Sequence, residues 1–564
     1  MNFHSFEYQR PVLSTFKADF EAALLHFETA DTIAEQNAAF EQITALRSDF
    51  ESMNTICSIR HTVNTKDAFY EKENDYFDEI SPDYQALVTQ FYKALLEARF
   101  RAELEQKWGQ QLFVLAELSL KTFEPTIMND LQEENRLCSE YTKLLASCKI
   151  EFQGKTYNLS GLSPIETGAD RALRQAASEA KWNFFAQNEA DFDRIFDELV
   201  KTRHRIAVAL GYKNFIELGY ARMNRSDYTP EMVANYRQQI YELIVPIATR
   251  IRERQQKRLG LDTLYYYDEG FSFNSGNPRP KGNPEWIVNH ARTMYKELAP
   301  ETHEFFEFML KNNLLDLENK ENKAPGGYCT MISKYQSPFI YSNFNGTSHD
   351  IDVLTHEAGH AFQTYESRKF GISEYHFPTY EACEIHSMSM EFLTWPWMKL
   401  FFEEDYEKYM FSHISGSILF LPYGVAVDEF QHWVYENHEA TPAERKAAWH
   451  NLEKKYLPHR QSGSNAFLAA GGFWQKQSHI YQSPFYYIDY TLAQICAFQF
   501  WKRSRENREL AWTDYLRLCK AGGSKSFLQL VDLAKLVSPF EDGCVKSVTS
   551  EIEDWLLSID DTKF

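Results

Sequence analysis

Helical periodicity with few interruptions is the feature that most constrains how this chain can fold. From Ser14 to about Ala146, apolar residues recur every three or four positions in segments such as FKADFEAALLHFETA and DYQALVTQFYKALLEARFRAELEQKW. That spacing is typical of one buried helix face. Helical patterns resume at about Pro164, extend to Asp262 and return in most of the last third of the chain. The sequence therefore predicts a mainly α, multi-helical protein.

Chain length and one non-helical segment indicate how these helices are divided. The chain has 564 residues, more than the roughly 250–300 at which a single hydrophobic core usually stops growing, so we expect two lobes with a cleft between them. The segment KIEFQGKTYNLSGLSP, which begins at Lys149, alternates apolar and polar residues about a Gln-Gly turn and predicts a β-hairpin. We place the boundary there, with an N-terminal helical lobe at residues 1–160 and a second region at 161–564.

A second break in the helical pattern comes near the middle of the chain. The segment FSFNSGNPRPKGNPEW collects Gly, Pro and Asn before a helix with Asn283 as its N-cap and Pro284 at its first position. Farther along, GGYCTMISKYQSPFIYSNFNG at residues 326–346 carries β-branched and aromatic residues between glycines and predicts two short strands. Our hypothesis is that an extended peptide adds to the edge of this small sheet.

Charge and cysteine usage exclude several classes of function. The formal net charge is -21 with a pI near 5.3, and no block of Lys and Arg is present, so nucleic acid and anionic membranes are not expected partners. The start of the chain has no basic region followed by an apolar run, and the longest uncharged stretch, MFSHISGSILFLPYGVAV, contains Gly, Pro, Ser and His. Eight cysteines without a CxxC pair suit reduced thiols. We expect a cytoplasmic protein.

Residues 355–361, THEAGHA, contain the strongest functional signal in the sequence. A helix that starts near Ser348 would place His356 and His360 one turn apart on one face, where two imidazoles can chelate one zinc ion. Glu357 would then lie beside the metal as the general base for a bound water. A chance HExxH match in a chain of this composition has a probability on the order of 0.04, so the motif needs a third ligand to support it.

Glu384 is the predicted third ligand. The metzincin pattern is excluded because Gln363 and Glu366 stand where it requires Gly and His. Downstream, YEACEIHSMSMEFLTWP predicts a helix that ends at a proline, and Glu384 lies on it 24 residues after His360. His376 and His386 are the competing candidates for this ligand, although most isolated histidines are surface or satisfied core residues.

Several segments together resemble the oligoendopeptidase F branch of the thimet-oligopeptidase family of zinc metallopeptidases, including its Pz-peptidase-like members. HEAGHAFQ is followed by EACEIHSMSMEF and, near the C-terminus, by HIYQSPFYYIDYTLAQ, while YARMNRSDY and GGYCT come earlier. The likeness covers about residues 150–550. It implies a helical two-lobed ellipsoid whose deep substrate channel admits unfolded oligopeptides, with the small β-sheet near the zinc helix.

The resemblance also implies roles for individual residues. His356, His360 and Glu384 become the ligands of one zinc ion, and Glu357 becomes the general base. The residues that match the C-terminal His and Tyr cluster of the family, which contacts the scissile carbonyl, are His479, Tyr487 and Tyr490. Because QSPFYYIDY lacks the glycine that thimet oligopeptidase has in a mobile loop here, Tyr486 is a neighbouring candidate.

A second departure concerns the residue that supports a ligand histidine. Other zinc peptidases place an Asp four positions after the ligand Glu, and here that position is Met388. Asp352, one turn before His356, and Glu391, two turns after Glu384, are the candidates for this support. The sequence does not choose between them.

Two other functions remain open from the sequence. A zinc aminopeptidase would need acidic groups that hold a free amino terminus, and cleavage of end-blocked peptides would exclude it. A peptide-binding or scaffold protein would use the metal only for stability, but the presence of Glu357 favours catalysis. The sequence leaves cleavage preference, physiological substrates and oligomeric state undetermined.

Overall fold

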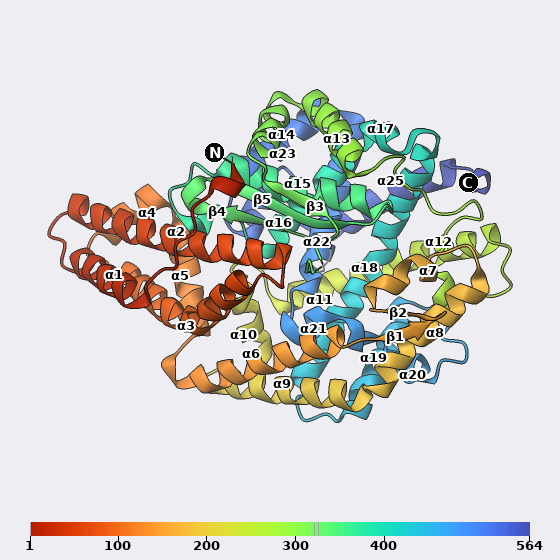
Figure 1. Cartoon of the computed structure of the whole chain (residues 1–564), viewed down its shortest axis with the longest axis horizontal. Helices are drawn as coiled ribbons and strands as arrows, with labels where there is room; N and C mark the ends of the chain where they lie inside the picture. Colours follow the sequence, from red (N-terminus) through yellow and green to blue (C-terminus); the bar gives the residue numbers. More distant parts are fainter. Residues whose placement is uncertain (1, 321, 325) are drawn as a thin grey trace.

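The computed structural model describes residues 2–320, 322–324 and 326–564, and most of them lie in helices, so the predicted mainly α fold is confirmed (Figure 1). The first five helices gather at one end of the molecule, at the left of Figure 1. Thr32 caps the second of them through a reciprocal capping box with Glu35, which fixes where this helix begins. The five are α1 (Leu13–Glu28), α2 (Ile33–Val63), α3 (Ala68–Leu96), α4 (Arg101–Trp108) and α5 (Gln110–Thr122).

The next group of helices lines the lower side of the molecule in Figure 1 and continues to its right. The predicted hairpin is confirmed: Ile150 pairs with Tyr157 in antiparallel register, and Gln153 and Gly154 adopt the positive φ of 50° and 75° that such a turn requires. Helix α6, before the hairpin, packs against α9, which follows it. The division of the chain into two lobes at residue 160 stays a prediction. The elements are α6 (Met128–Ala146), β1 (Ile150–Phe152), β2 (Lys155–Tyr157), α7 (Ser163–Glu166), α8 (Arg171–Gln187), α9 (Glu189–Ala209), α10 (Phe215–Arg222), α11 (Pro230–Gln239) and α12 (Val245–Arg258).

The helix predicted to follow Asn283 has that residue as its N-cap, because Asn283 Oδ1 accepts the Trp286 amide at 2.9 Å. After it, a three-stranded sheet lies beside the segment that carries the histidine motif. Both expected strands form, with β5 in the centre and antiparallel β4 at one edge. Strand β3, parallel to β5 on the other side, was not predicted. Its sequence, Leu-Asp-Leu-Glu, alternates apolar and polar residues, but only over four positions that run directly into the polar segment NKENK, so the strand signal is weak. The elements are α13 (Pro284–Leu298), α14 (Pro300–Lys311), β3 (Leu315–Glu318), β4 (Tyr328–Ile332) and β5 (Ser337–Phe344).

The remaining helices include the central layer of the molecule. Helix α15 packs on β4 and β5, α16 packs on α15, and α22 packs on α16 (Figure 1). This order brings together three segments that lie far apart in the sequence. The helices are α15 (His349–Ser367), α16 (Tyr380–Leu393), α17 (Lys399–Phe402), α18 (Tyr406–Glu436), α19 (Pro442–Tyr456), α20 (Ala466–Ala469), α21 (Ser478–Gln482), α22 (Tyr487–Glu506), α23 (Arg508–Ala521), α24 (Phe527–Leu533) and α25 (Cys544–Ser558).

Helix α18 contains the long uncharged stretch, and Gly416 and Pro422 do not interrupt it. One stretch, Lys399–Glu436, is long and apolar enough to cross a membrane by length and composition, and 56% of its most apolar window is buried inside the protein. The helix contacts α12, α19 and α22. Seven of the cysteines are free thiols, as the sequence predicted: Cys138, Cys148, Cys329, Cys383, Cys496, Cys519 and Cys544.

Candidate metal centre

Glycine at position 359 lets α15 and α16 approach each other at backbone distance. A Cβ atom added to Gly359 would lie 2.6 Å from the carbonyl oxygen of His386 and 2.7 Å from Cα of Ser387, both on α16. Such contacts are closer than any side chain tolerates, and neither neighbour is a flexible side-chain end. The weak helix former within THEAGHA is therefore required by packing, and it brings the side chains of two helices to one point.

His356, His360 and Glu384 converge at that point. The Nε2 atoms of the two histidines lie 3.2 and 3.5 Å from Glu384 Oε2, and the three candidate ligand atoms all lie within 4.8 Å of one another. Both histidines are half-buried and Glu384 is buried. Burial opposes ionisation of Glu384, but the histidines outweigh it and hold the pKa of its carboxyl well below the usual range. The structure thus brings together the three predicted ligands.

Glu391 fixes the orientation of His356. His356 Nδ1 donates to Glu391 Oε1 at 2.7 Å, and His413 Nε2 on α18 donates to the other oxygen at 2.7 Å. With Nδ1 bonded to Glu391, a neutral His356 would direct the lone pair of Nε2 toward the point that Glu384 also faces, where a metal ion could accept it. Although burial opposes ionisation, these two hydrogen bonds lower the pKa of Glu391 to about 2.

Asp352, the other candidate support, makes a different contact. Its Oδ1 accepts the hydroxyl of Tyr409 at 2.6 Å. Burial raises the pKa of its carboxyl. Of the two acids that the sequence left open, the structure therefore places Glu391 against a candidate ligand and Asp352 against a tyrosine of α18.

Glu357 lies beside the three converging side chains with part of its carboxylate unpaired. Its exposed fraction is 7%, and among the residues that the structure describes no group hydrogen-bonds its Oε2. Burial raises the pKa of Glu357, while His356 and His360 act in the opposite direction. A buried carboxylate oxygen without a partner costs free energy unless a further group, such as a water, occupies the space before it.

The predicted His and Tyr cluster forms a second wall of the site. The Tyr486 hydroxyl donates to Glu384 Oε1 at 3.0 Å. The His479 ring centroid lies 5.7 Å from that of Tyr486, 5.0 Å from that of Tyr487 and 5.8 Å from that of Tyr490. These rings are half-buried. Burial is the largest cause that raises the pKa of each phenol, so all three remain protonated hydrogen-bond donors near neutral pH.

The competing ligand candidates point elsewhere. His376 Nε2 lies 3.2 Å from the carbonyl oxygen of Phe370, and His386 Nδ1 lies 2.7 Å from that of Ala382 on its own helix. Neither histidine belongs to the converging group.

The sequence analysis missed two residues of the site. His413 is 57 positions after His356 on another helix, so no spacing rule could connect them. Ser387 donates to Glu384 Oε2 at 2.9 Å, and its place three residues after Glu384 on the same helix is a signal that could have identified it.

The donor set fits a zinc ion. Two neutral imidazole nitrogens and one carboxylate are the ligands of many catalytic zinc sites, which keep a further position open. The unpaired Glu357 oxygen beside them fits a water at that open position. His356, His360 and Glu384 could therefore hold the metal with Glu357 left free for chemistry.

The fold and the comparisons with known proteins together define a peptidase. The chain belongs to peptidase family M3: the model of that family matches residues 166–549, and the model described as the peptidase M3 N-terminal domain matches residues 3–123. The resemblance to oligoendopeptidase F proteins is confirmed by solved structures and by curated relatives.

A structure titled Pz peptidase A with inhibitor 2 has 59% sequence identity and a TM-score of 0.96, with 100% of both chains covered. A putative oligoendopeptidase F from Bacillus anthracis has 60% identity and a TM-score of 0.92, with 100% of this chain and 99% of that chain covered. Oligopeptidase PepF of Bacillus subtilis is 22% identical over 489 residues, which are 80% of this chain and 71% of that protein.

Proposed function

We propose that this peptidase is a zinc-dependent endopeptidase that hydrolyses internal bonds of short, unstructured oligopeptides in the cytoplasm. The observation that carries the proposal is the convergence of His356, His360 and Glu384 with Glu357 beside them, in a chain of peptidase family M3. The relatives are named as an oligopeptidase and an oligoendopeptidase, which supports the choice of substrate. The acidic surface and reduced cysteines are consistent with the proposed location.

Zinc, when bound, would supply a Lewis acid that polarises the scissile carbonyl and makes a water nucleophilic near neutral pH. Glu357 would take the proton from the attacking water, since one of its buried carboxylate oxygens has no hydrogen-bond partner among the described residues. It would then return that proton to the departing amine. Burial raises the pKa of the Glu357 carboxyl, which makes its carboxylate a stronger base toward the attacking water.

The tyrosines and His479 would stabilise the carbonyl oxygen as negative charge develops on it. The Tyr486 hydroxyl donates to Glu384 and so lies at the candidate metal centre. It would need only to move this hydrogen bond from Glu384 to the carbonyl oxygen of the substrate. Tyr487, Tyr490 and His479 surround it. Phenol donors held in a partly buried site stabilise a developing oxyanion more strongly than water does.

Strand β4 is positioned to align the peptide. It is an edge strand, which pairs with β5 alone among the described strands. Gly327, the residue before it, lies near Glu357: a Cβ at Gly327 would lie 3.5 Å from Glu357 Oε1. An extended peptide that adds to this edge would bring its own carbonyl groups past Glu357. Main-chain contacts to residues 326–344 in an inhibitor complex would support this arrangement.

The test is cleavage of an internally quenched peptide of about ten residues that is blocked at both ends. Wild-type protein should cleave it, a chelator should abolish cleavage and added zinc should restore it. Glu357→Gln should lower turnover by about a hundredfold to ten-thousandfold while it retains zinc, which elemental analysis would measure.

Each alternative gives a different result in that assay. Cleavage only of peptides with a free amino terminus would indicate an aminopeptidase. If zinc-loaded wild type cleaved no peptide of a varied set, the metal would have a structural role and the chain would be a binding protein.

A further inference from the structure

Phe485, the residue before Tyr486, has a backbone conformation that phenylalanine rarely adopts. Its φ is 68°. It is the third residue of a turn at 483–486, which the Tyr486 amide closes by donating to the Ser483 carbonyl at 3.2 Å. Turns that need a positive φ at this position usually have glycine there, because a Cβ is strained in the left-handed region. A bulky residue keeps such a conformation only where the surrounding structure holds it.

The Phe485 ring is fully buried and occupies the space that Gly219 of α10 leaves open. A Cβ added to Gly219 would lie 2.5 Å from Cδ2 of this ring and 2.8 Å from its Cε2. The ring centroid also lies 5.0 Å from that of His432 and 5.5 Å from that of Tyr435, both on α18. The ring thus packs against two helices, and a side chain at position 219 would displace it.

Two buried side chains bond to the backbone of Phe485, one on each side. Gln431 Oε1 of α18 accepts the Phe485 amide at 2.9 Å. Arg225 Nη2 donates to the Phe485 carbonyl and, at 2.6 Å, to Asp489 Oδ1 in the first turn of α22. Gln431 is 1% exposed, and the side chains of Arg225 and Asp489 are fully buried. The peptide groups on both sides of Phe485 are therefore fixed, and the same guanidinium joins the turn to the helix that follows.

Arg225 belongs to the segment YARMNRSDY, to which the proposed mechanism gives no role. Its guanidinium carbon lies 4.4 Å from the ring centroid of Tyr220 and 5.5 Å from that of Tyr228, so the segment itself holds this side chain in place. Its Nε and Nη1 have no hydrogen-bond partner among the described residues, and both of its side-chain hydrogen bonds come from Nη2. The segment thus places one buried donor at the turn.

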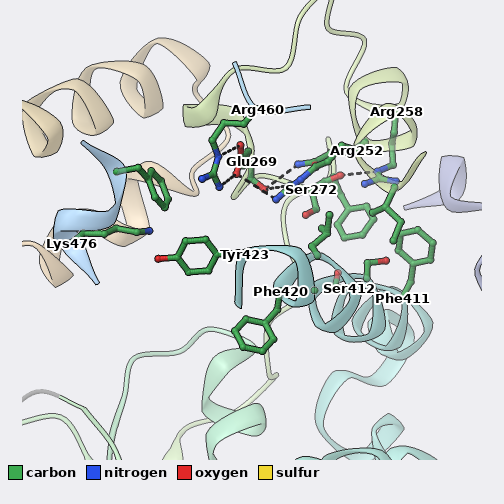
Figure 2. Close-up of a pocket in the computed structure, with 17 residues that line it drawn as sticks. Arg252, Arg258, Glu269, Ser272, Phe411, Ser412, Phe420, Tyr423, Arg460 and Lys476 are labelled. Atoms are coloured by element: carbon green, nitrogen blue, oxygen red, sulfur yellow. Dashed lines mark hydrogen bonds and ion pairs between the residues drawn. The ribbon is translucent and has the colours of Figure 1, made fainter. Parts of the chain in front are cut away.

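Helix α18 also holds the next aromatic residue of the cluster. The ring centroid of Tyr487 lies 5.7 Å from that of Phe420 and 5.7 Å from that of Tyr423, and both contacts are edge-to-face. Figure 2 shows these two side chains of α18 beside a cavity that they line. Because α18 also carries His413, which supports the metal centre, one helix contacts both walls of the site.

We propose that three positions outside the reacting groups aim the Tyr486 hydroxyl at the carbonyl oxygen of the substrate, because they hold Phe485 in its strained conformation. These positioning residues are Arg225, Gln431 and Gly219. The inference rests on the proposed peptidase function. The Tyr486 hydroxyl donates at 3.0 Å to the carboxylate of the candidate metal centre, so a rotation in the turn would move this donor away from the reacting atoms. A donor that is fixed before the substrate arrives needs no reorganisation during the reaction.

The first test is Gln431→Met, which removes the acceptor of the Phe485 amide and nearly preserves the side-chain volume. It should lower kcat by about tenfold to a hundredfold and leave KM within about threefold, because a donor misplaced by about 1 Å affects turnover more than binding. Zinc content should not change. Gln499→Met is the matched control, since Gln499 Oε1 accepts a backbone amide in the same way, that of Val537 at 2.8 Å, but away from the turn. It should leave kcat unchanged.

Two further substitutions act on the same turn. Gly219→Ala places a methyl group against the Phe485 ring and should lower kcat in the same way, so the test does not depend on the folding of one variant. Arg225→Lys keeps a cationic donor for the Phe485 carbonyl and for Asp489, and should retain more of the wild-type kcat than Arg225→Met.

The Tyr486→Phe background separates aiming of the hydroxyl from general support of the fold. If the three positions act through that hydroxyl, Gln431→Met should lower kcat by less than about twofold once the hydroxyl is absent. The same loss of kcat in the Tyr486→Phe background as in wild type would show a structural role and would overturn the proposal.

Binding of a phosphinic peptide gives a second measurement that needs no cleavage, because its anionic oxygen resembles the developing oxyanion. Gln431→Met should weaken this binding by about the factor by which it lowers kcat, and the difference should disappear in the Tyr486→Phe background. If wild type cleaves no peptide, the peptidase function is rejected while phosphinate binding still tests the positioning role. Wild-type kcat and phosphinate affinity in both Gln431→Met and Gly219→Ala would overturn the proposal.

Discussion

Two pairs of consecutive helices in this molecule bury very different side chains. In the pair α1 and α2, Phe16 stacks near Phe50 with ring centroids 4.9 Å apart, and Phe20 and Ile43 are fully buried. In the pair α15 and α16, the buried face instead contains carboxylates, imidazoles and hydroxyls, including Glu357, Glu381, Glu384, His386 and Ser387. The first contact needs only apolar volume, whereas the second needs particular donors and acceptors in fixed positions.

This difference predicts which property of the protein, stability or function, each kind of substitution should change. A change in the α1–α2 contact should alter the stability of the protein and leave the chemistry of the folded molecules intact. A conservative change in the α15–α16 contact should alter metal binding or turnover out of proportion to its effect on stability. Three substitutions would test this distinction.

Phe20→Ala should have the largest effect on stability. Removal of a fully buried phenylalanine ring leaves a cavity and should lower the free energy of unfolding by about 3–5 kcal/mol. Denaturant titration would measure this, and the folded fraction should keep wild-type zinc content and kcat. Loss of zinc from protein that is still folded would show that the N-terminal helices support the metal centre directly.

Glu391→Gln should weaken zinc binding by about tenfold to a hundredfold, because it removes the charged acceptor that orients His356. Competition with a chelating dye would report the affinity without reference to activity. Asp352→Asn is the matched control, since Asp352 contacts Tyr409 and should leave the affinity within about threefold. An equal loss in both variants would remove the distinction between the two acids.

Gly359→Ala should give the smallest effect of the three, about 1–3 kcal/mol in the free energy of unfolding, since its methyl group would force α15 and α16 apart. Gly416→Ala is the comparison within α18, because its added Cβ would meet no heavy atom of the described residues within 4 Å beyond its chain neighbours and the backbone of its own helix. This second variant should stabilise the protein by up to about 1 kcal/mol. Thermal unfolding of both would test whether the close approach, rather than glycine itself, is what matters.

The sequence predicts the apolar contacts of the fold better than the contacts that depend on long-range packing. Where packing is apolar, the periodicity of three to four predicted the helices, and the alternation about Gln153 and Gly154 predicted the hairpin. Strand β3 was missed because its alternation lasts for only four residues, so its conformation depends on long-range pairing to β5. The continuity of α18 through Pro422 likewise depends on the helices packed around it.

The candidate site was predictable where its residues share a helix turn or a motif. His356, Glu357 and His360 follow from one spacing, and Glu384 from the helix that comes next. The choice between Asp352 and Glu391 required the structure. Each acid lies on a helix face from which it could reach His356, and only the packing of α18 brings His413 to Glu391.

The sequence separations within the metal centre have a consequence for biosynthesis. His360 and Glu384 are 24 residues apart, whereas 102 residues separate Glu384 from Tyr486. The entropic cost of closing a loop grows with its length, by about 0.6 kcal/mol for each doubling. The ligands would therefore assemble once α16 has left the ribosome, while the tyrosines of α22 are still unmade. Under the proposed function, a nascent chain would therefore be able to bind zinc before the tyrosines that complete the site are synthesised.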